Sequence, residues 1–276
     1  MRLVVRSAIV AIALVVAQQA AAVGPWLWTV DGGPGIAAPN SVRYVARLSG
    51  PATKVLANRD GETLRSVSMP GHWGLQAATL AGGLTGLSGD GRLLVLTPPT
   101  RGEPVDVSAF ALVATPALKQ LGTIRLRGDF TVDALSPNGS TLYLIQHLAG
   151  HDVGRYQVRA YDVRARKLLK RVVADKRQAG WTMHGYPMAR AATATGSRVY
   201  TLYGPGDNYP FIHALDTVAG TAVCVGLPLS WADPNSLDGA RLTLSADGRR
   251  LTVAGPRLGA TISVDTRTFK VTRAGA

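Results

Sequence analysis

The sequence has few of the residues that usually carry covalent or acid chemistry. Its 276 residues include one cysteine, and only 17% are charged. The single cysteine, Cys224, cannot form an intrachain disulfide and is not by itself a zinc site. It lies in the apolar run 222–225, so we predict a buried, unreactive thiol. The only glutamates are Glu62 and Glu103, so a glycosidase-type acid pair would have to use aspartates.

Familiar catalytic motifs are also missing. The sequence contains no Gly-x-Ser-x-Gly, the nucleophile turn of many serine hydrolases. The glycine cluster at 32–35 is not followed by Lys-Ser or Lys-Thr, so it does not read as a phosphate-binding loop. No amphipathic stretch of helical length stands out beyond residue 22. We therefore predict no cofactor and no metal site, and we assign no residue a catalytic role.

The first residues have the pattern of an export signal. Arg2 and Arg6 precede a short apolar core at 8–17, and small residues follow at 20–22. We predict a signal peptide over 1–22 and a secreted or extracytoplasmic protein. Apolar residues resume at Val23, so an uncleaved segment that anchors the protein to a membrane is the alternative.

The charge is strongly positive. Lysine and arginine exceed the acidic residues by 13, without a dense basic block. An exported basic protein is attracted to anionic envelope polymers or lipid surfaces, and nucleic acid does not fit export. The alternative is an ordinary solvated surface with no anionic partner.

What is abundant is one repeated turn. It reads Leu-Ser-Gly-Asp-Gly-Arg at 87–92, Leu-Ser-Pro-Asn-Gly-Ser at 135–140 and Leu-Ser-Ala-Asp-Gly-Arg at 244–249, with a weaker copy at 194–197. Each copy precedes an apolar, β-rich run. The turn glycines Gly91, Gly139, Gly196 and Gly248 follow at intervals of 48, 57 and 52 residues. Repeats of this length with four strands each are typical of propeller blades.

The repeats predict an all-β fold, a β-propeller of four-stranded antiparallel blades over 42–276, after an N-terminal extension at 23–41. Five blades fit best, and six or seven with irregular blades are the alternatives. The first unit shows three clear strands. Residues 26–30 could supply its inner strand, with 31–40 as a loop, or one terminus could complete a blade begun by the other.

A second recurrent element is an aspartate between the third and fourth strands of a unit. Asp162, Asp216 and Asp265 occupy this place. We predict that each closes a turn on its own backbone, because a residue that recurs once per repeat is structural by position.

Together these elements resemble the WD40-like or YVTN-type β-propellers of secreted bacterial proteins. The residues that carry the resemblance are Leu-Ser-x-Asp/Asn-Gly and Val-x-Asp-Thr, although the Trp-Asp dipeptide of true WD40 repeats is missing. The segments 127–137 and 210–217 are similar to an uncharacterised exported family of actinobacterial type. The resemblance implies an architecture and brings no established activity.

The candidate ligand-binding residues lie where the repeats differ. Two acids flank a predicted inner strand, several polar and aromatic residues lie in long loops, and one histidine lies in a strand, where we favour a hydrogen-bonded structural role. His147 and His151 would need a third ligand to hold a metal. The candidates are Asp129, Asp133, His147, His184, Tyr186, Tyr203, Asp207 and His213.

These observations favour a monomeric, secreted or envelope-associated propeller that binds an unknown protein or a small-molecule or carbohydrate ligand through one mouth of its channel. The alternative is a propeller enzyme of lactonase, lyase or hydrolase type. It would require a compact cluster of histidine and aspartate in the channel.

Overall fold

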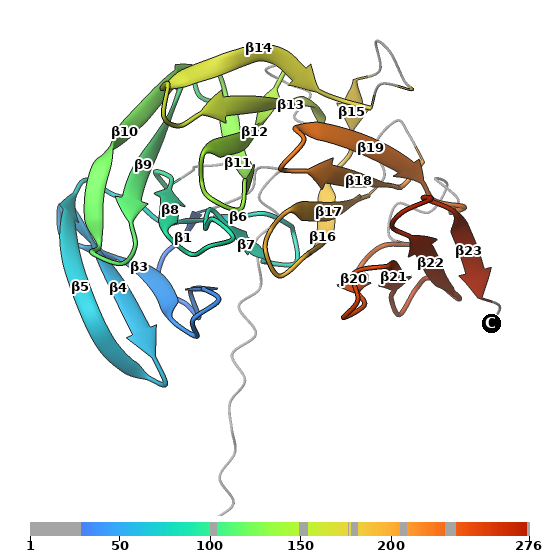
Figure 1. Cartoon of the computed structure of the whole chain (residues 1–276), viewed down its shortest axis with the longest axis horizontal. Helices are drawn as coiled ribbons and strands as arrows, with labels where there is room; N and C mark the ends of the chain where they lie inside the picture. The colour runs from blue at the N-terminus through green and yellow to red at the C-terminus, as the bar shows by residue number, and fades with distance from the viewer. Residues whose placement is uncertain are drawn as a thin grey trace, which may run out of the picture.

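The fold is an arc of small antiparallel sheets. The computed structural model describes residues 29–99, 104–148, 154–175, 177, 182–204, 209–229 and 236–274. Within these residues the chain forms strands and turns but no helix, and the sheets are arranged around a common axis (Figure 1). This arrangement confirms the predicted all-β class and the four-stranded repeat.

Five blades follow one another along the chain. In each blade the strands run outwards from the axis in sequence order, which is the arrangement that the repeated turns predict. The strands are β2 (Ile36–Ala37), β3 (Arg43–Ser49), β4 (Ala52–Arg59) and β5 (Glu62–Pro70) in blade 1; β7 (Leu84–Thr85), β8 (Leu93–Leu96), β9 (Val107–Ala114) and β10 (Lys119–Arg127) in blade 2; β11 (Phe130–Leu135), β12 (Thr141–His147), β13 (Arg155–Asp162) and β14 (Lys167–Val173) in blade 3; β16 (Pro187–Ala192), β17 (Arg198–Tyr203), β18 (Phe211–Asp216) and β19 (Thr221–Gly226) in blade 4; and β20 (Arg241–Leu244), β21 (Arg250–Ala254), β22 (Thr261–Asp265) and β23 (Val271–Ala274) in blade 5.

Three short strands lie outside or at the edge of this scheme. β15 (Met183–His184) extends blade 3 by pairing with β13. β1 (Thr29–Val30) pairs with β6 (Leu75–Ala77), which forms a hairpin with the inner strand β7. In blade 2, β7 continues towards β8 through a bridge between Leu87 and Leu94.

The first blade corrects one prediction. Its inner strand is β2, inside the segment 31–40 that we expected to be a loop, while Thr29 and Val30 pair with β6 instead. A strand of two residues carries no alternation, and the surrounding glycines and prolines hide it. Residues 1–28, which include the predicted signal peptide, lie outside the described residues.

A separate apolar core fills each contact between neighbouring blades. Leu94 and Val113 lie in the core between blades 1 and 2, and Leu144 lies in the core between blades 2 and 3. Val158 belongs to the core between blades 3 and 4, and Leu251 to the core between blades 4 and 5. Burying each such side chain contributes about 1.5–3 kcal/mol, so the blades are held together mainly by these four cores.

The repeated turn has the same conformation in each copy. Gly91, Gly139, Gly196 and Gly248 all have φ between +69° and +71°, a left-handed backbone that favours glycine. The third-to-fourth-strand aspartates also behave as predicted. In each case a carboxylate oxygen accepts the backbone N–H three residues on, at 2.7 Å from Asp162, 2.8 Å from Asp216 and 2.6 Å from Asp265.

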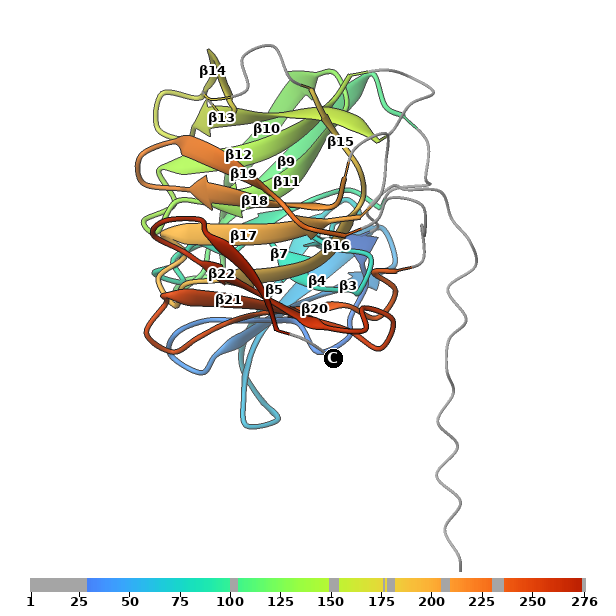
Figure 2. The ribbon, with the colours of Figure 1, turned by 90° about the vertical axis from the view of Figure 1, so that its right-hand side faces the viewer.

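The arc is not closed into a ring. No strand of blade 5 pairs with a strand of blade 1 within the described residues, so a blade shared between the two termini is not seen. Figure 2 shows the arc from the side, with the strands of successive blades stacked above one another. In the part of the chain covered by these sheets, no helix has the length and apolarity needed to cross a bilayer.

Candidate functional site

A cavity of about 340 Å³ lies where the inner strands of four blades converge. Its volume is in the range of small-molecule sites. Most of the wall is apolar, and Arg190, Thr85, Ser88 and Thr193 add polar groups. The lining residues are Ile36, Ala37, Ala38, Pro39, Leu84, Thr85, Leu87, Ser88, Gly89, Ala134, Leu135, Arg190, Ala192, Thr193, Ala194, Gly196 and Val199.

The repeated turns of blades 2, 3 and 4 meet beside this cavity. The backbone N–H of Asp90 donates to the carbonyl of Pro137 at 2.8 Å, and Gly89 lies against the backbone of Thr195. Because Gly89 and Gly196 also line the cavity, the turns form part of its wall. The repeated motif therefore shapes the cavity without supplying a catalytic group.

Asp133 joins the inner strands of three blades. A register shift between Val132 and Ala134 places Asp133 at a bulge of β11. Its carboxylate forms an ion pair with the guanidinium of Arg190 in blade 4. Its carbonyl accepts hydrogen bonds from Arg190 Nη1 at 2.5 Å and from Thr85 Oγ1 in blade 2 at 2.8 Å. The side chain of Asp133 is only 2% exposed, so it is a buried structural acid rather than a solvated group at the mouth.

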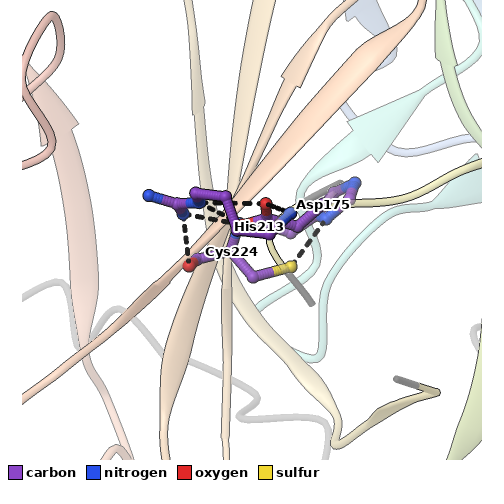
Figure 3. Close-up of polar contacts among 4 residues, drawn as sticks. Asp175, His213 and Cys224 are labelled. Carbon is purple, nitrogen blue, oxygen red and sulfur yellow. Dashed lines mark hydrogen bonds and ion pairs between the residues drawn. The ribbon is translucent and has the colours of Figure 1, made fainter. Parts of the chain in front are cut away.

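The ion pair begins a polar row that crosses blade 4. Arg190, Thr201, His213 and Cys224 are cross-strand neighbours on the four strands β16 to β19. Arg190 Nε donates to Thr201 Oγ1 at 3.1 Å, and Cys224 Sγ lies 3.7 Å from His213 Nδ1 (Figure 3). His213 Nε2 and Asp133 Oδ2 are buried and have no hydrogen-bond partner among the described residues.

Burial keeps the middle of this row uncharged. It raises the pKa of the Cys224 thiol to about 12 and lowers the pKa of His213. The predicted burial of Cys224 is confirmed. A thiol that is not ionised is a poor nucleophile, which agrees with the predicted lack of reactivity.

Asp175 closes the outer end of the row. It is 4% exposed, and its Oδ2 accepts the backbone N–H of Cys224 at 2.9 Å and Arg177 Nη2 at 2.6 Å (Figure 3). Burial alone would raise the pKa of Asp175. The hydrogen bonds from Arg177 and from the backbone outweigh burial and lower the pKa to about 2. Asp175 therefore remains ionised at neutral pH.

A second group of polar residues lies at one end of blade 3. Asp129 and His147 are opposite each other on neighbouring chain segments, and the backbone N–H of His147 donates to the backbone carbonyl of Asp129 at 3.0 Å. His147 Nε2 also lies 3.4 Å from Thr131 Oγ1. Burial raises the pKa of Asp129 to about 6, and its Oδ2 has no hydrogen-bond partner among the described residues.

This raised pKa makes a prediction for Asp129→Asn. The folded state holds the Asp129 proton up to about pH 6, whereas the unfolded state releases it near pH 4, so stability falls between these values and stays lower above them. Because the side chain is partly exposed, we expect a gain of only about 1 kcal/mol from Asp129→Asn at neutral pH. Thermal unfolding should show a rise in Tm of about 2–4 °C at about pH 7 and no rise at about pH 3.

The matched control is Asp106→Asn, which neutralises an exposed aspartate elsewhere. If both variants have the same Tm at neutral pH, the carboxyl group of Asp129 does not carry the burial cost described here.

The remaining candidates do not form one site. His184 lies in β15 and Tyr186 just beyond it, both half-buried. We expected Tyr203 in a long loop, and this prediction is wrong. Tyr203 is the last residue of β17 and is 1% exposed. Its ring stacks between those of Tyr156 and Phe211, with ring centroids 5.1 Å apart on each side. Asp207 and His151 lie outside the described residues. The structure thus brings Asp133 and His213 to one polar row, Asp129 and His147 to another place, and Tyr203 into the core.

Sequence reasoning missed Arg190 and Asp175. The only signals were a lone charge among small residues at 188–192 and a lone acid in a basic stretch at 164–177. No group of three histidine, cysteine, aspartate or glutamate side chains in the described ranges is close enough to hold a metal ion.

Comparisons with known proteins agree with the fold. No family model matches the sequence, and no curated protein is similar to it. The chain is similar to the Dos1 propeller, with 11% identity and a TM-score of 0.50 over 86% of this chain and 56% of that chain. It is also similar to the β-propeller domain of Cps50 (Swd1) from Myceliophteria thermophila, with 13% identity and a TM-score of 0.50 over 90% and 71% of the two chains.

A third match is TolB from Acinetobacter baumannii, with 15% identity, a TM-score of 0.47, and coverage of 86% of this chain and 52% of that chain. The chain thus spans about half the length of the Dos1 propeller and TolB chains. With the five blades and their cores, the matches to Dos1 and Cps50 define the class of protein: it is a β-propeller.

Proposed function

We propose that this propeller is a non-catalytic binding scaffold, secreted or associated with the cell envelope, whose central cavity holds a small carbohydrate or similar polyol. The observation that carries the proposal is the 340 Å³ cavity between four inner strands, with an apolar wall and a few fixed polar groups. Asp133 already neutralises Arg190, so the cavity suits an uncharged ligand better than an anion. Thr85 Oγ1 donates to the Asp133 carbonyl and Thr193 Oγ1 accepts the Arg198 N–H, and each oxygen keeps a lone pair that can accept a hydrogen bond from a sugar hydroxyl.

The rigidity of the wall supports this use. Inner strands from four blades, tied together at Asp133, hold their polar groups in place before a ligand arrives. Binding to a preformed site avoids the free-energy cost of ordering mobile groups.

The test is a panel of mono- and disaccharides measured by thermal shift and calorimetry. At a concentration of about 100 Kd, a one-site ligand stabilises the protein by about 2.7 kcal/mol, or roughly 5–10 °C in Tm. Ala192→Phe, which places a ring in the cavity, should weaken binding at least tenfold, whereas Ala219→Phe in an exposed turn should leave it unchanged.

Two results would contradict the proposal. Equal binding by wild type and Ala192→Phe would show that the ligand does not bind in the cavity. Conversion of a bound sugar to product by the wild type would exclude a purely binding role.

A second candidate function rests on Asp129 and His147. Asp129 has a carboxyl group with a pKa of about 6, and His147 pairs with it through the backbone. A carboxyl group with a raised pKa on the same strand pair as a histidine is a candidate for general acid–base catalysis, which favours the propeller-enzyme alternative at this end of blade 3. Lactone and glycoside substrates provide the test. Turnover that is lost in Asp129→Asn and follows a pH profile near about 6 would support an enzyme, and turnover retained in that variant would remove this pair from consideration.

A further inference from the structure

Blade 5 has two unlike faces. Its inner-facing side packs on blade 4 through Leu251, Val253 and Ile262. Blade 4 meets them with the side chains of Tyr200, Leu202, Ile212, Ala214 and Val225. The far side of blade 5 borders the open gap of the arc, and no strand of another described blade pairs with it (Figure 1).

The far side replaces those apolar residues with hydroxyl groups and small side chains. Aligning the turn glycines and the turn aspartates of blades 4 and 5 puts Thr252 in the place of Tyr200, and Ser263 in the place of Ala214. Cross-strand pairing forms a row of four hydroxyl groups over all four strands of the blade, from Thr243, Thr252, Ser263 and Thr272. Such a face offers no apolar core to a neighbouring blade, and its hydroxyl groups suit contact with water or a polar ligand.

The same face carries Arg250, whose counterpart in blade 4 forms an ion pair. In blade 4, Arg198 binds Asp216 at 3.2 Å. At the equivalent place in blade 5, Asp265 Oδ1 accepts the N–H groups of two turn residues and the hydroxyl of Thr268 at 2.7 Å. In blade 4 the N–H groups of Val218 and Ala219 donate to Asp216 Oδ1 in the same way, and Asp216 Oδ2 is the oxygen that pairs with Arg198. Arg250, which takes the place of Arg198 in blade 5, forms no ion pair with the described residues.

The face is also hollowed. A cavity of about 720 Å³ lies over it, and its lining contains three cations, two aspartates, four hydroxyl groups and one alanine. It contains no aromatic or large aliphatic side chain. The lining residues are Ser245, Ala246, Asp247, Arg249, Arg250, Ser263, Asp265, Thr268, Lys270 and Thr272. Arg241, exposed on the same side, adds a further positive charge.

This composition selects among anionic partners. A nucleic acid would require aromatic groups for base stacking, and a protein hot spot would require buried aromatic or apolar anchors. A membrane surface would favour apolar side chains that enter the interface. A charged sugar chain needs cations for its anionic groups and hydroxyl groups for its own hydroxyl groups, and the cavity offers both.

We propose that the far face of blade 5 binds an anionic polysaccharide, with Arg250 and Lys270 pairing with its anionic groups and Ser263 and Thr272 hydrogen-bonding its sugar hydroxyls. The site lies on the opposite side of blade 5 from its contact with blade 4, and it shares no residue with the central cavity. The two sites are therefore testable independently. The aspartates of the lining accept hydrogen bonds from their own turns, and neither forms an ion pair with Arg250 or Lys270 among the described residues.

The probe is immobilised polygalacturonate, with neutral dextran as reference, and the readout is Kd by biolayer interferometry at low and physiological salt. We expect binding to polygalacturonate that weakens with salt. Arg250→Gln/Lys270→Gln should weaken it about tenfold. Arg164→Gln/Lys170→Gln makes the same charge change on exposed residues of blade 3 and should alter Kd less than about twofold.

A second pair of changes tests the hydroxyl row without touching charge. Ser263→Ala/Thr272→Val preserves side-chain size closely and should weaken binding about threefold. The proposal is overturned if dextran binds as well as polygalacturonate, if both charge variants lose affinity equally, or if the protein binds phosphatidylglycerol vesicles and not polygalacturonate. Failure of the sugar panel at the central cavity would leave this result unaffected.

Discussion

Arg190→Met is expected to lower the free energy of unfolding by about 3–5 kcal/mol. The change removes the guanidinium that pairs with Asp133 and donates to the Asp133 carbonyl and to Thr201. The carboxylate then remains buried without a cation, at 2% exposure, and this uncompensated charge is the main cost. Urea unfolding followed by tryptophan fluorescence would show the loss as a lower midpoint.

The control is Arg198→Met in the next strand. Arg198 forms an ion pair of similar type with Asp216, but the two side chains are 46% and 22% exposed. Solvent screens such a pair, so we expect a loss below about 1 kcal/mol. Equal losses in the two variants would show that burial does not set the energy of the Asp133–Arg190 pair.

A double variant separates the pair from its surroundings. Asp133→Asn/Arg190→Met removes both charges and keeps the size of the Asp133 side chain, so it should be more stable than Arg190→Met alone. The single variants Asp133→Asn and Arg190→Met are measured alongside. If the free energy of unfolding lost in the double variant equals the sum of the two single losses, the side chains act independently and the ion pair contributes nothing of its own.

The sequence predicts the blades well because a blade is a local structure. Each turn glycine and each turn aspartate makes hydrogen bonds within a few residues, so the pattern that forms the turn is visible in the chain. The inner strand of blade 1 is the exception. Ile36 and Ala37 are held by pairing with Arg43 and Tyr44 rather than by any alternation of their own.

The candidate site was harder to predict because it is built between blades. Asp133 was identified as a candidate, but its partners Thr85 and Arg190 lie 48 and 57 residues away in sequence. Their meeting depends on the bulge in β11 and on how blades 2, 3 and 4 are packed. Tyr203 was misplaced for the same reason: its stacking with Tyr156 depends on contacts between two blades.

Gly89→Ala is the second change with a large expected effect. Gly89 takes the variable position of the repeated turn, where the other copies have Pro137, Ala194 and Ala246. A Cβ at this position would lie 1.7 Å from the carbonyl oxygen of Thr195 and 3.2 Å from Cα of Pro137. Both neighbours are backbone atoms, so no side-chain rotation relieves the clash. We expect a loss of about 3 kcal/mol or more, because the turns of blades 2, 3 and 4 must separate.

Gly248→Ala is the matched control because it tests backbone conformation without crowding. Gly248 has φ +71°, and an added Cβ would meet nothing within 4 Å, so only the left-handed strain of about 1–2 kcal/mol applies. Hydrogen exchange adds a local measurement. The Asp90 N–H, bonded to the Pro137 carbonyl at 2.8 Å, should exchange faster in Gly89→Ala and not in Gly248→Ala. If Gly89→Ala costs no more than Gly248→Ala and Asp90 stays protected, the three turns do not meet beside the cavity, and the variable residue of the motif has no role in packing one blade against another.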